Sequence, residues 1–171
     1  IGEDCGSGED CISGICTPHL GEKQCTKTCD ESCPEGWSCV LVGDGQDAQY
    51  VCLSNAPKLC LPCTNSESCQ GEMPGTCVTY GAGGSFCGAS CDLDSPCPAG
   101  FDCQETTTTE GASTYQCVAA SGECPCSSLA INSALSTSCE ASNEHGTCQG
   151  VRTCAPEGLS PCSAATPVAE T

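Results

Sequence analysis

The sequence predicts a small disulfide-rich protein, made of tandem cysteine-rich modules with short β-hairpins, little regular secondary structure and one short helix in the C-terminal module. It has 23 cysteines among 171 residues, a proportion typical of disulfide scaffolds. Large apolar residues are scarce: two Phe, three Tyr, one Trp and one Met cannot fill a conventional core for this length. We therefore expect crosslinks to replace much of the missing apolar burial, and complete reduction to unfold the chain.

So many cysteines imply an oxidising compartment, because cytosolic thiols are kept reduced. We expect a secreted, extracellular or cell-surface protein, in a mature or excised form whose export signal has been removed. No apolar run approaches the ~20 residues that span a bilayer, so no membrane insertion is expected. The net charge of −18 repels phosphate backbones, which excludes nucleic acid as a partner.

An eight-cysteine repeat occurs twice, and we assign residues 1–59 to the first copy with its linker and residues 60–120 to the second. The first copy contains Cys5, Cys11, Cys16, Cys25, Cys29, Cys33, Cys39 and Cys52, and the second contains Cys63, Cys69, Cys77, Cys87, Cys91, Cys97, Cys103 and Cys117. Successive spacings are 6, 5, 9, 4, 4, 6, 13 and 6, 8, 10, 4, 6, 6, 14. Coinciding registers predict one disulfide connectivity for both copies.

The match includes a turn, C-P-E-G-W-S-C at 33–39 and C-P-A-G-F-D-C at 97–103. Proline followed by glycine two residues later favours a tight turn. This turn places an aromatic, Trp37 or Phe101, at the same point of each copy. With Tyr50 or Tyr115 it is interpreted as the miniature core of that copy, ligand stacking being the alternative.

Hairpins are expected after each turn. In copy one, residues 38–42 and 49–52 flank a Gly- and Asp-rich segment, which is typical of a β-hairpin. In copy two the threonine-rich segment 105–113 is expected to form an exposed hairpin tip, where O-linked sugar is an alternative. Residues 54–59 form the linker between the copies.

The third module, residues 121–171, has a different cysteine rhythm. Its six cysteines are expected to form disulfides. They are Cys124, Cys126, Cys139, Cys148, Cys154 and Cys162. Residues 127–135 predict one short helix that begins at a serine, residues 147–154 a hairpin, and residues 163–171 have linker composition.

One cysteine, Cys60, lies outside every repeat position. Because 23 is odd, at least one thiol has no partner within the chain. We expect Cys60 to join the repeats to the third module through Cys124 or Cys126, so that another cysteine of that module is left to pair outside these residues. An intermolecular bond or a buried free thiol at Cys60 are the alternatives.

Metal sites are weighed against simpler interpretations. A zinc tetrathiolate from Cys60-L-P-Cys63 and Cys124-P-Cys126 is less favoured than disulfides, and a thioredoxin-like role would need a helix where residues 64–68 indicate a turn. Carboxylates for calcium occur at Asp44 with Asp47, Asp92 with Asp94, and Glu3-Asp4 with Glu9-Asp10. None matches a twelve-residue calcium loop, so we predict no metal or cofactor, with calcium left open.

Catalytic motifs are absent from the sequence, which has only His19 and His145, both in turn-like segments. It contains no G-x-S-x-G, H-E-x-x-H or C-x-x-C-H motif. We predict a protein that is not an enzyme, although a pair of carboxylates of the glycosidase type is visible only in a structure.

The strings C-x-S-G-x-C at 11–16, C-P-E-G-W-x-C and C-P-A-G-F-x-C resemble the cysteine-rich repeats of secreted proteins from delta-proteobacteria, especially myxobacteria. The segment N-E-H-G-T-C-Q-G at 143–150, with A-T-P-V-A-E at 165–170, is similar to the segment on the C-terminal side of those repeats. In that family an acidic metal-binding repeat often comes next, similar to one in a methanotroph surface copper-binding protein. No such motif occurs in these residues, and the resemblance implies only a surface or extracellular setting.

The leading hypothesis is a structural subunit of a bacterial surface fibre, sheath or layer, which self-associates or binds another surface protein. It depends on the tandem modules, the crosslinking and the odd cysteine. The alternative is a monomeric secreted module that binds calcium, another metal or a surface partner within a longer chain.

Overall fold

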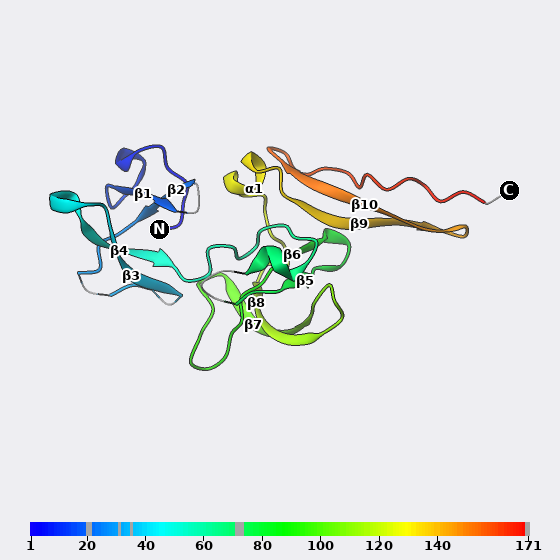
Figure 1. Ribbon diagram of the computed structural model, residues 1–171, viewed down its shortest axis with the longest axis horizontal. Helices are drawn as coiled ribbons and strands as arrows, with labels where there is room; N and C mark the ends of the chain where they lie inside the picture. The colour runs from blue at the N-terminus through cyan, green and yellow to red at the C-terminus, as the bar shows by residue number, and fades with distance from the viewer. Residues whose placement is uncertain (20–21, 31, 35, 71–73, 170–171) are drawn as a thin grey trace.

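Figure 1 shows the computed structural model, which describes residues 1–19, 22–30, 32–34, 36–70 and 74–169. Four two-stranded antiparallel hairpins precede one short helix and a three-stranded antiparallel sheet. This confirms the predicted fold class: short hairpins, one short helix and extensive disulfides. In the described residues, no helix is long and apolar enough to cross a membrane.

The hairpins form in chain order, each from neighbouring strands. Their strands are β1 Ile15–His19, β2 Glu22–Thr26, β3 Trp37–Val42, β4 Gln49–Ser54, β5 Cys77–Thr79, β6 Ser85–Cys87, β7 Phe101–Thr107 and β8 Ser113–Ala119. Short 3-10 helices lie before or inside the hairpins: η1 Gly8–Asp10, η2 Gly45–Asp47, η3 Ser66–Cys69 and η4 Gly81–Gly83. Two-stranded hairpins are marginal alone in water, so each needs another source of stability.

The hairpin expected after the first turn is present, with η2 inside its loop. The threonine-rich segment 105–113 forms the tip of the β7–β8 hairpin and seven of its nine residues are exposed, as expected, although strand β7 continues through Thr107. Thr108 is 5% exposed, and the N–H of Thr109 donates to the Cys77 carbonyl at 2.9 Å. The tip is therefore tied back to the first hairpin of its own copy.

The third module begins with α1 Ser128–Asn132, where helix was expected, and Ser127 caps it by accepting from the Ala130 N–H. Strands β9 Ser136–Asn143 and β10 Gly146–Ala155 form one long hairpin, and β11 Gly158–Leu159 adds to β10. The prediction of a separate hairpin over 147–154 is wrong. The turn lies at 144–145, and Gly150 is not a turn residue: its lack of a side chain admits Ala164, whose N would lie 2.2 Å from a Cβ at that position.

The C-terminal segment packs on this hairpin despite its linker composition, and Figure 1 shows it running beside β10. The Ser163 N–H donates to the Val151 carbonyl at 3.0 Å, and Asn143 Nδ2 donates to the Pro167 carbonyl at 2.8 Å. Pro167 is buried. The described tail is thus part of the module's fold.

Cysteine supplies most of the interior. Of the nineteen buried apolar residues in the described part of the chain, eleven are cysteines. The aromatic prediction holds only in part: Trp37 and Phe101 are partly buried, whereas Tyr50 and Tyr115 are 60% and 57% exposed. Because side chains alternate along a strand, the residue after each tyrosine points the opposite way and is the buried one.

The two copies touch through the linker. Ala56 is buried in a cluster with Ala89 and Cys117 of the second copy, and Lys58 Nζ donates to the Ser68 carbonyl at 3.1 Å. The linker is therefore a packed connection. The boundaries assigned at 59/60 and 120/121 stay a prediction.

Candidate functional site: the cysteine framework

Each eight-cysteine copy consists of two four-cysteine units with identical pairing. In every unit the first cysteine bonds to the third and the second to the fourth. The bonds are Cys5–Cys16, Cys11–Cys25, Cys29–Cys39, Cys33–Cys52, Cys63–Cys77, Cys69–Cys87, Cys91–Cys103 and Cys97–Cys117. The two copies therefore share one connectivity, as their registers predicted. The finer division into four units was not predicted.

The geometry of a unit follows from its hairpin. Its last two cysteines are directly opposite each other across the strands, as in Cys77 with Cys87 and Cys103 with Cys117. Each of the first two cysteines bonds to one member of that pair. Two disulfides thus lie side by side, and this crosslinking stabilises hairpins whose strands are as short as three residues.

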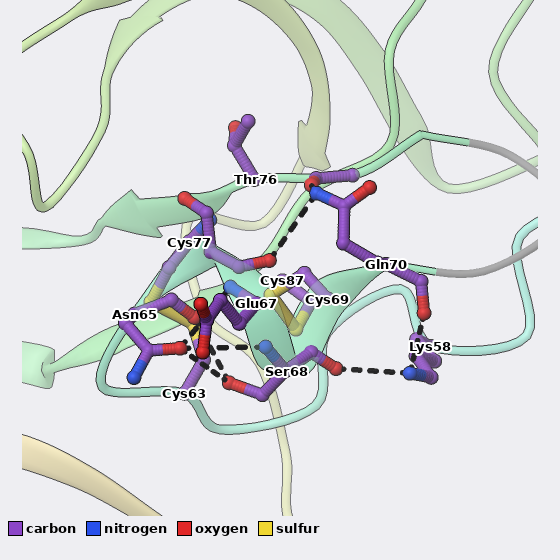
Figure 2. The surroundings of a disulfide bond; sticks show 12 residues. Lys58, Cys63, Asn65, Glu67, Ser68, Cys69, Gln70, Thr76, Cys77 and Cys87 are labelled. Atoms are coloured by element: carbon purple, nitrogen blue, oxygen red, sulfur yellow. Dashed lines mark hydrogen bonds between the residues drawn. A yellow bond between two sulfur atoms is a disulfide. The ribbon is translucent and has the colours of Figure 1, made fainter.

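Figure 2 shows this arrangement in the first unit of copy two, where Cys63–Cys77 and Cys69–Cys87 lie together beside η3. Asn65 caps η3 by accepting from the backbone N–H of Glu67 at 3.1 Å. In this unit the sulfur atoms of Cys63, Cys69 and Cys87 lie within 4.8 Å of one another and are buried. Disulfides account for this sulfur cluster, so its geometry by itself indicates no metal.

The first residues of each copy pair with that copy's first hairpin. The Gly2 N–H donates to the Cys25 carbonyl at 2.8 Å, and the Cys60 N–H donates to the Cys87 carbonyl at 2.8 Å. Gly2 and Cys60 each precede the first cysteine of their copy by three residues and have positive φ values of 93° and 68°. Copy two therefore places a cysteine where copy one has glycine, although a left-handed conformation costs about 1–2 kcal/mol for a residue with a Cβ.

Cys60 bonds to Cys124, one of its two expected partners, across a sequence separation of 64. This excludes the alternative of a buried free thiol at Cys60. It also separates the residues weighed for a zinc tetrathiolate, because Cys63 bonds to Cys77 and Cys126 to Cys154. Those cysteines are held in three different disulfides.

An apolar cluster, called the docking surface below, surrounds the disulfide between Cys60 and Cys124. Phe86, Ala119 and Cys124 are buried together, and Tyr80 and Leu159 pack against them. The rings of Tyr80 and Phe86 meet edge to face with centroids 5.4 Å apart. Burial raises the pKa of Tyr80, although its hydroxyl accepts from the Ala119 N–H at 3.0 Å.

The third module repeats the pairing rule with wider spacing. Cys126 bonds to Cys154 and Cys139 to Cys162, and Cys148 has no disulfide partner in the chain. Cys148 is therefore the cysteine of this module that was expected to lack a partner within the chain, because the two pairs and the bond to Cys60 use the module's other thiols. Cys148 lies on β10 opposite Ala141 and is half-buried.

Two of the carboxylates weighed for calcium, Asp10 and Asp92, take part in local turns. Asp92 Oδ1 accepts from the N–H groups of Asp94 and Ser95, both at 2.8 Å. Asp10 accepts from Ser7 and Gly6, and these hydrogen bonds lower its pKa. These contacts account for Asp10 and Asp92 without an ion, and calcium binding stays an alternative.

The two histidines do not come with a recognisable catalytic arrangement in the part of the chain that the structure describes. His145 lies in the β9–β10 turn, with Nε2 3.5 Å from the adjacent Glu144. The side chain of His19 lies outside the described residues. The prediction that the protein is not an enzyme is therefore left as a prediction.

A polar groove of about 760 Å³ lies between the β9–β10 hairpin and the first hairpin of copy two. Hydroxyl side chains of Thr64, Thr79, Ser85 and Thr109 line one wall. The opposite wall is formed by β9, by Gln149 and Arg152 of β10, and by Pro161 and Cys162 of the C-terminal segment. No sequence feature singled out this groove, because it arises from the docking of modules.

Comparisons with protein-family models, curated proteins and solved structures find no match to this chain. The resemblance to bacterial cysteine-rich repeats thus stays an expectation.

Proposed function

We propose that the protein is a non-enzymatic extracellular structural protein, a subunit of a disulfide-stabilised fibre, sheath or layer on a bacterial surface. The observation that carries this proposal is the tandem array of four units with one crosslinking plan. Eleven intrachain disulfides fit an extracellular protein.

The high density of disulfides suits a structural role outside the cell. Because each disulfide restricts the unfolded chain, stability persists where a small apolar core would fail. The connection between copies is also fixed, by the burial of Ala56 and by contact between Gly36 and Pro98. A chain of such units transmits force through covalent bonds and short packed linkers.

The Cys148 thiol supplies a means of covalent assembly. In an oxidising compartment, two such thiols from neighbouring subunits lose two protons and two electrons to molecular oxygen or to an oxidoreductase disulfide, and form one bond. A net charge of −18 per chain opposes non-covalent self-association at low ionic strength, which favours a covalent link.

Mass spectrometry of the natural, non-reduced material tests this proposal. We expect peptides that join Cys148 to a second chain. The Cys148→Ser variant should remain monomeric and keep its intrachain disulfides. Stoichiometric thiol labelling of Cys148 in the intact material would contradict covalent assembly.

The second candidate function is a monomeric secreted binding module. The polar groove beside β9 is the observation that favours it. A monomeric natural protein with a ligand in that groove would support this alternative over the structural role.

A further inference from the structure

The outer edge of β9 is an unpaired strand edge. The Val151 N–H donates to Ser163 Oγ at 2.9 Å, so it points away from β9, its partner strand. Val151 and Ser138 therefore form a non-hydrogen-bonded pair in the ladder. By alternation, the N–H and C=O groups of Ser138, Glu140 and Ser142 point outward from the sheet.

These outward groups have no internal partner. In the part of the chain that the structure describes, no backbone or side-chain group outside the β9–β10 ladder bonds to the main chain of Ser138, Glu140 or Ser142. The opposite edge of the sheet is covered, by β11 and by the tail. One edge is thus protected and the other is open.

The open edge borders the polar groove described above. β9 touches copy two at Thr137, whose Oγ1 accepts from the Ser85 N–H at 2.5 Å. Beyond that contact Ser138 and Glu140 line the groove of about 760 Å³, together with residues of β10 and the C-terminal segment. An extended segment in the groove could meet the β9 edge with its main chain and the facing hydroxyl groups with its side chains.

The negative charge of the chain indicates which kind of segment would bind in the groove. The chain has 22 acidic residues against four Lys and Arg, and Glu140 is exposed in the middle of the open edge. Arg152, the base that lines the groove, already donates to the carbonyls of Ser160 and Gly83. A second copy of this chain would bring the same negative charge to the groove and be repelled.

We propose that the β9 edge and its groove bind an extended, lysine- or arginine-rich segment of another protein as an added antiparallel strand. This is recognition by strand addition, in which main-chain hydrogen bonds give affinity and side chains give selectivity. The proposal does not depend on the fibre assignment, because a monomeric module could use the same edge.

The probe is a ten-residue (Thr-Lys)5 peptide, added to the oxidised protein and followed by amide hydrogen exchange. We expect the amides of Ser138, Glu140 and Ser142 to exchange about tenfold more slowly or better, since each gains a hydrogen bond. A (Thr-Glu)5 peptide should not bind. Protection confined to other regions would overturn the proposal.

Glu140→Pro is the critical variant. Proline removes an outward N–H and projects its ring from the edge, without removing a donor to β10. We expect affinity for (Thr-Lys)5 to fall about tenfold or more. The matched variant Glu140→Gln keeps the main chain and should lose only about two- to threefold at low salt. Equal binding by Glu140→Pro and the unaltered protein would overturn the proposal.

A second measurement applies if Glu140→Pro fails to fold, which loss of exchange protection along β10 would reveal. A (Thr-Lys)5 peptide N-methylated at every residue keeps its charge but cannot donate a main-chain hydrogen bond from either edge. It should not bind the unaltered protein if strand addition is the mode, and undiminished binding would overturn the proposal by showing a purely electrostatic association.

Discussion

The two eight-cysteine copies have the same disulfide connectivity but carry different surfaces. Copy two presents Tyr80, Phe86 and Ala119 to the third module. The corresponding positions in copy one, counted from the nearest cysteines, are occupied by polar residues: His19, Gln24 and Ser54. The comparison teaches that disulfides determine the skeleton, whereas the residues between them determine what docks on it.

The same difference appears at the covalent attachment. Cys60 of copy two and Gly2 of copy one make equivalent main-chain hydrogen bonds, but only Cys60 can bond to the third module. In copy one the Trp37 ring lies beside Gly2, 3.3 Å from where a Cβ would be. In copy two the smaller Phe101 packs against the cluster that contains Cys124.

Complete reduction of the disulfides should have the largest effect and should unfold both copies. Eleven of the nineteen buried apolar residues are cysteines in the described region, so apolar burial without crosslinks should not offset chain entropy. We expect loss of circular dichroism and of protease resistance at neutral pH without denaturant. If the fully reduced chain stayed folded, apolar burial alone would be enough to stabilise it, which would contradict this expectation.

Removing the disulfide between Cys60 and Cys124 should affect the two copies differently, because only copy two is attached to the third module through it. Replacing Cys60 and Cys124 by Ala opens a loop of 64 residues, which by the chain-entropy model costs about 4 kcal/mol. We expect the third module to become protease-sensitive while copy one keeps its exchange protection. The control replaces Cys139 and Cys162, a shorter loop, and should leave the attachment to copy two intact.

The apolar docking surface provides a finer test. Phe86→Gln gives copy two the residue that copy one has at Gln24, and it should cost about 2–3 kcal/mol through lost burial and ring contact. Unfolding by denaturant, monitored in the oxidised protein, measures the change. Tyr115→Gln is the control, because that tyrosine is exposed, and its effect should stay within about 0.5 kcal/mol. Equal losses in both variants would contradict the assignment of the docking surface.

Acid should have the smallest effect, which is followed in copy two at Glu110. Glu110 accepts hydrogen bonds from the Ser66 N–H and hydroxyl at 3.0 and 2.9 Å, which lower its pKa to about 2. Because the folded pKa is below the unfolded value, this contact stabilises the fold above about pH 4.5 and is lost as pH falls toward 2. The carboxylate is exposed, so the loss is small. Faster exchange of the Ser66 amide over that range, absent in Glu110→Gln, checks the assignment.

Much of the framework was predictable from the sequence because cysteine spacing is a direct record of it. Coinciding registers indicated one connectivity for both copies, and the position of Cys60 outside them indicated its bond to the third module. The two units inside a copy were missed because their loops differ. One contains a 3-10 helix before its second cysteine and the other contains the C-P-x-G turn, so their spacings do not match.

Other features depend on tertiary packing that spacing does not encode. Tyr50 and Tyr115 were placed in the core because each lies two residues from a cysteine, yet the face that they occupy is uncovered. Cys148 could not be distinguished from its neighbours by composition. The pairing rule does not identify it either, because five cysteines of the module remain once Cys60 is assigned to Cys124, and any four of them could follow the rule.

The central claim is that one pairing rule recurs through the chain. Disulfide mapping of the natural oxidised protein, by digestion without reduction and mass spectrometry, tests it most directly. We expect first-to-third and second-to-fourth bonds in all four units, with Cys60 joined to Cys124 and Cys148 outside the intrachain set. Nested or sequential pairing in any unit, such as Cys63 bonded to Cys69, would contradict it.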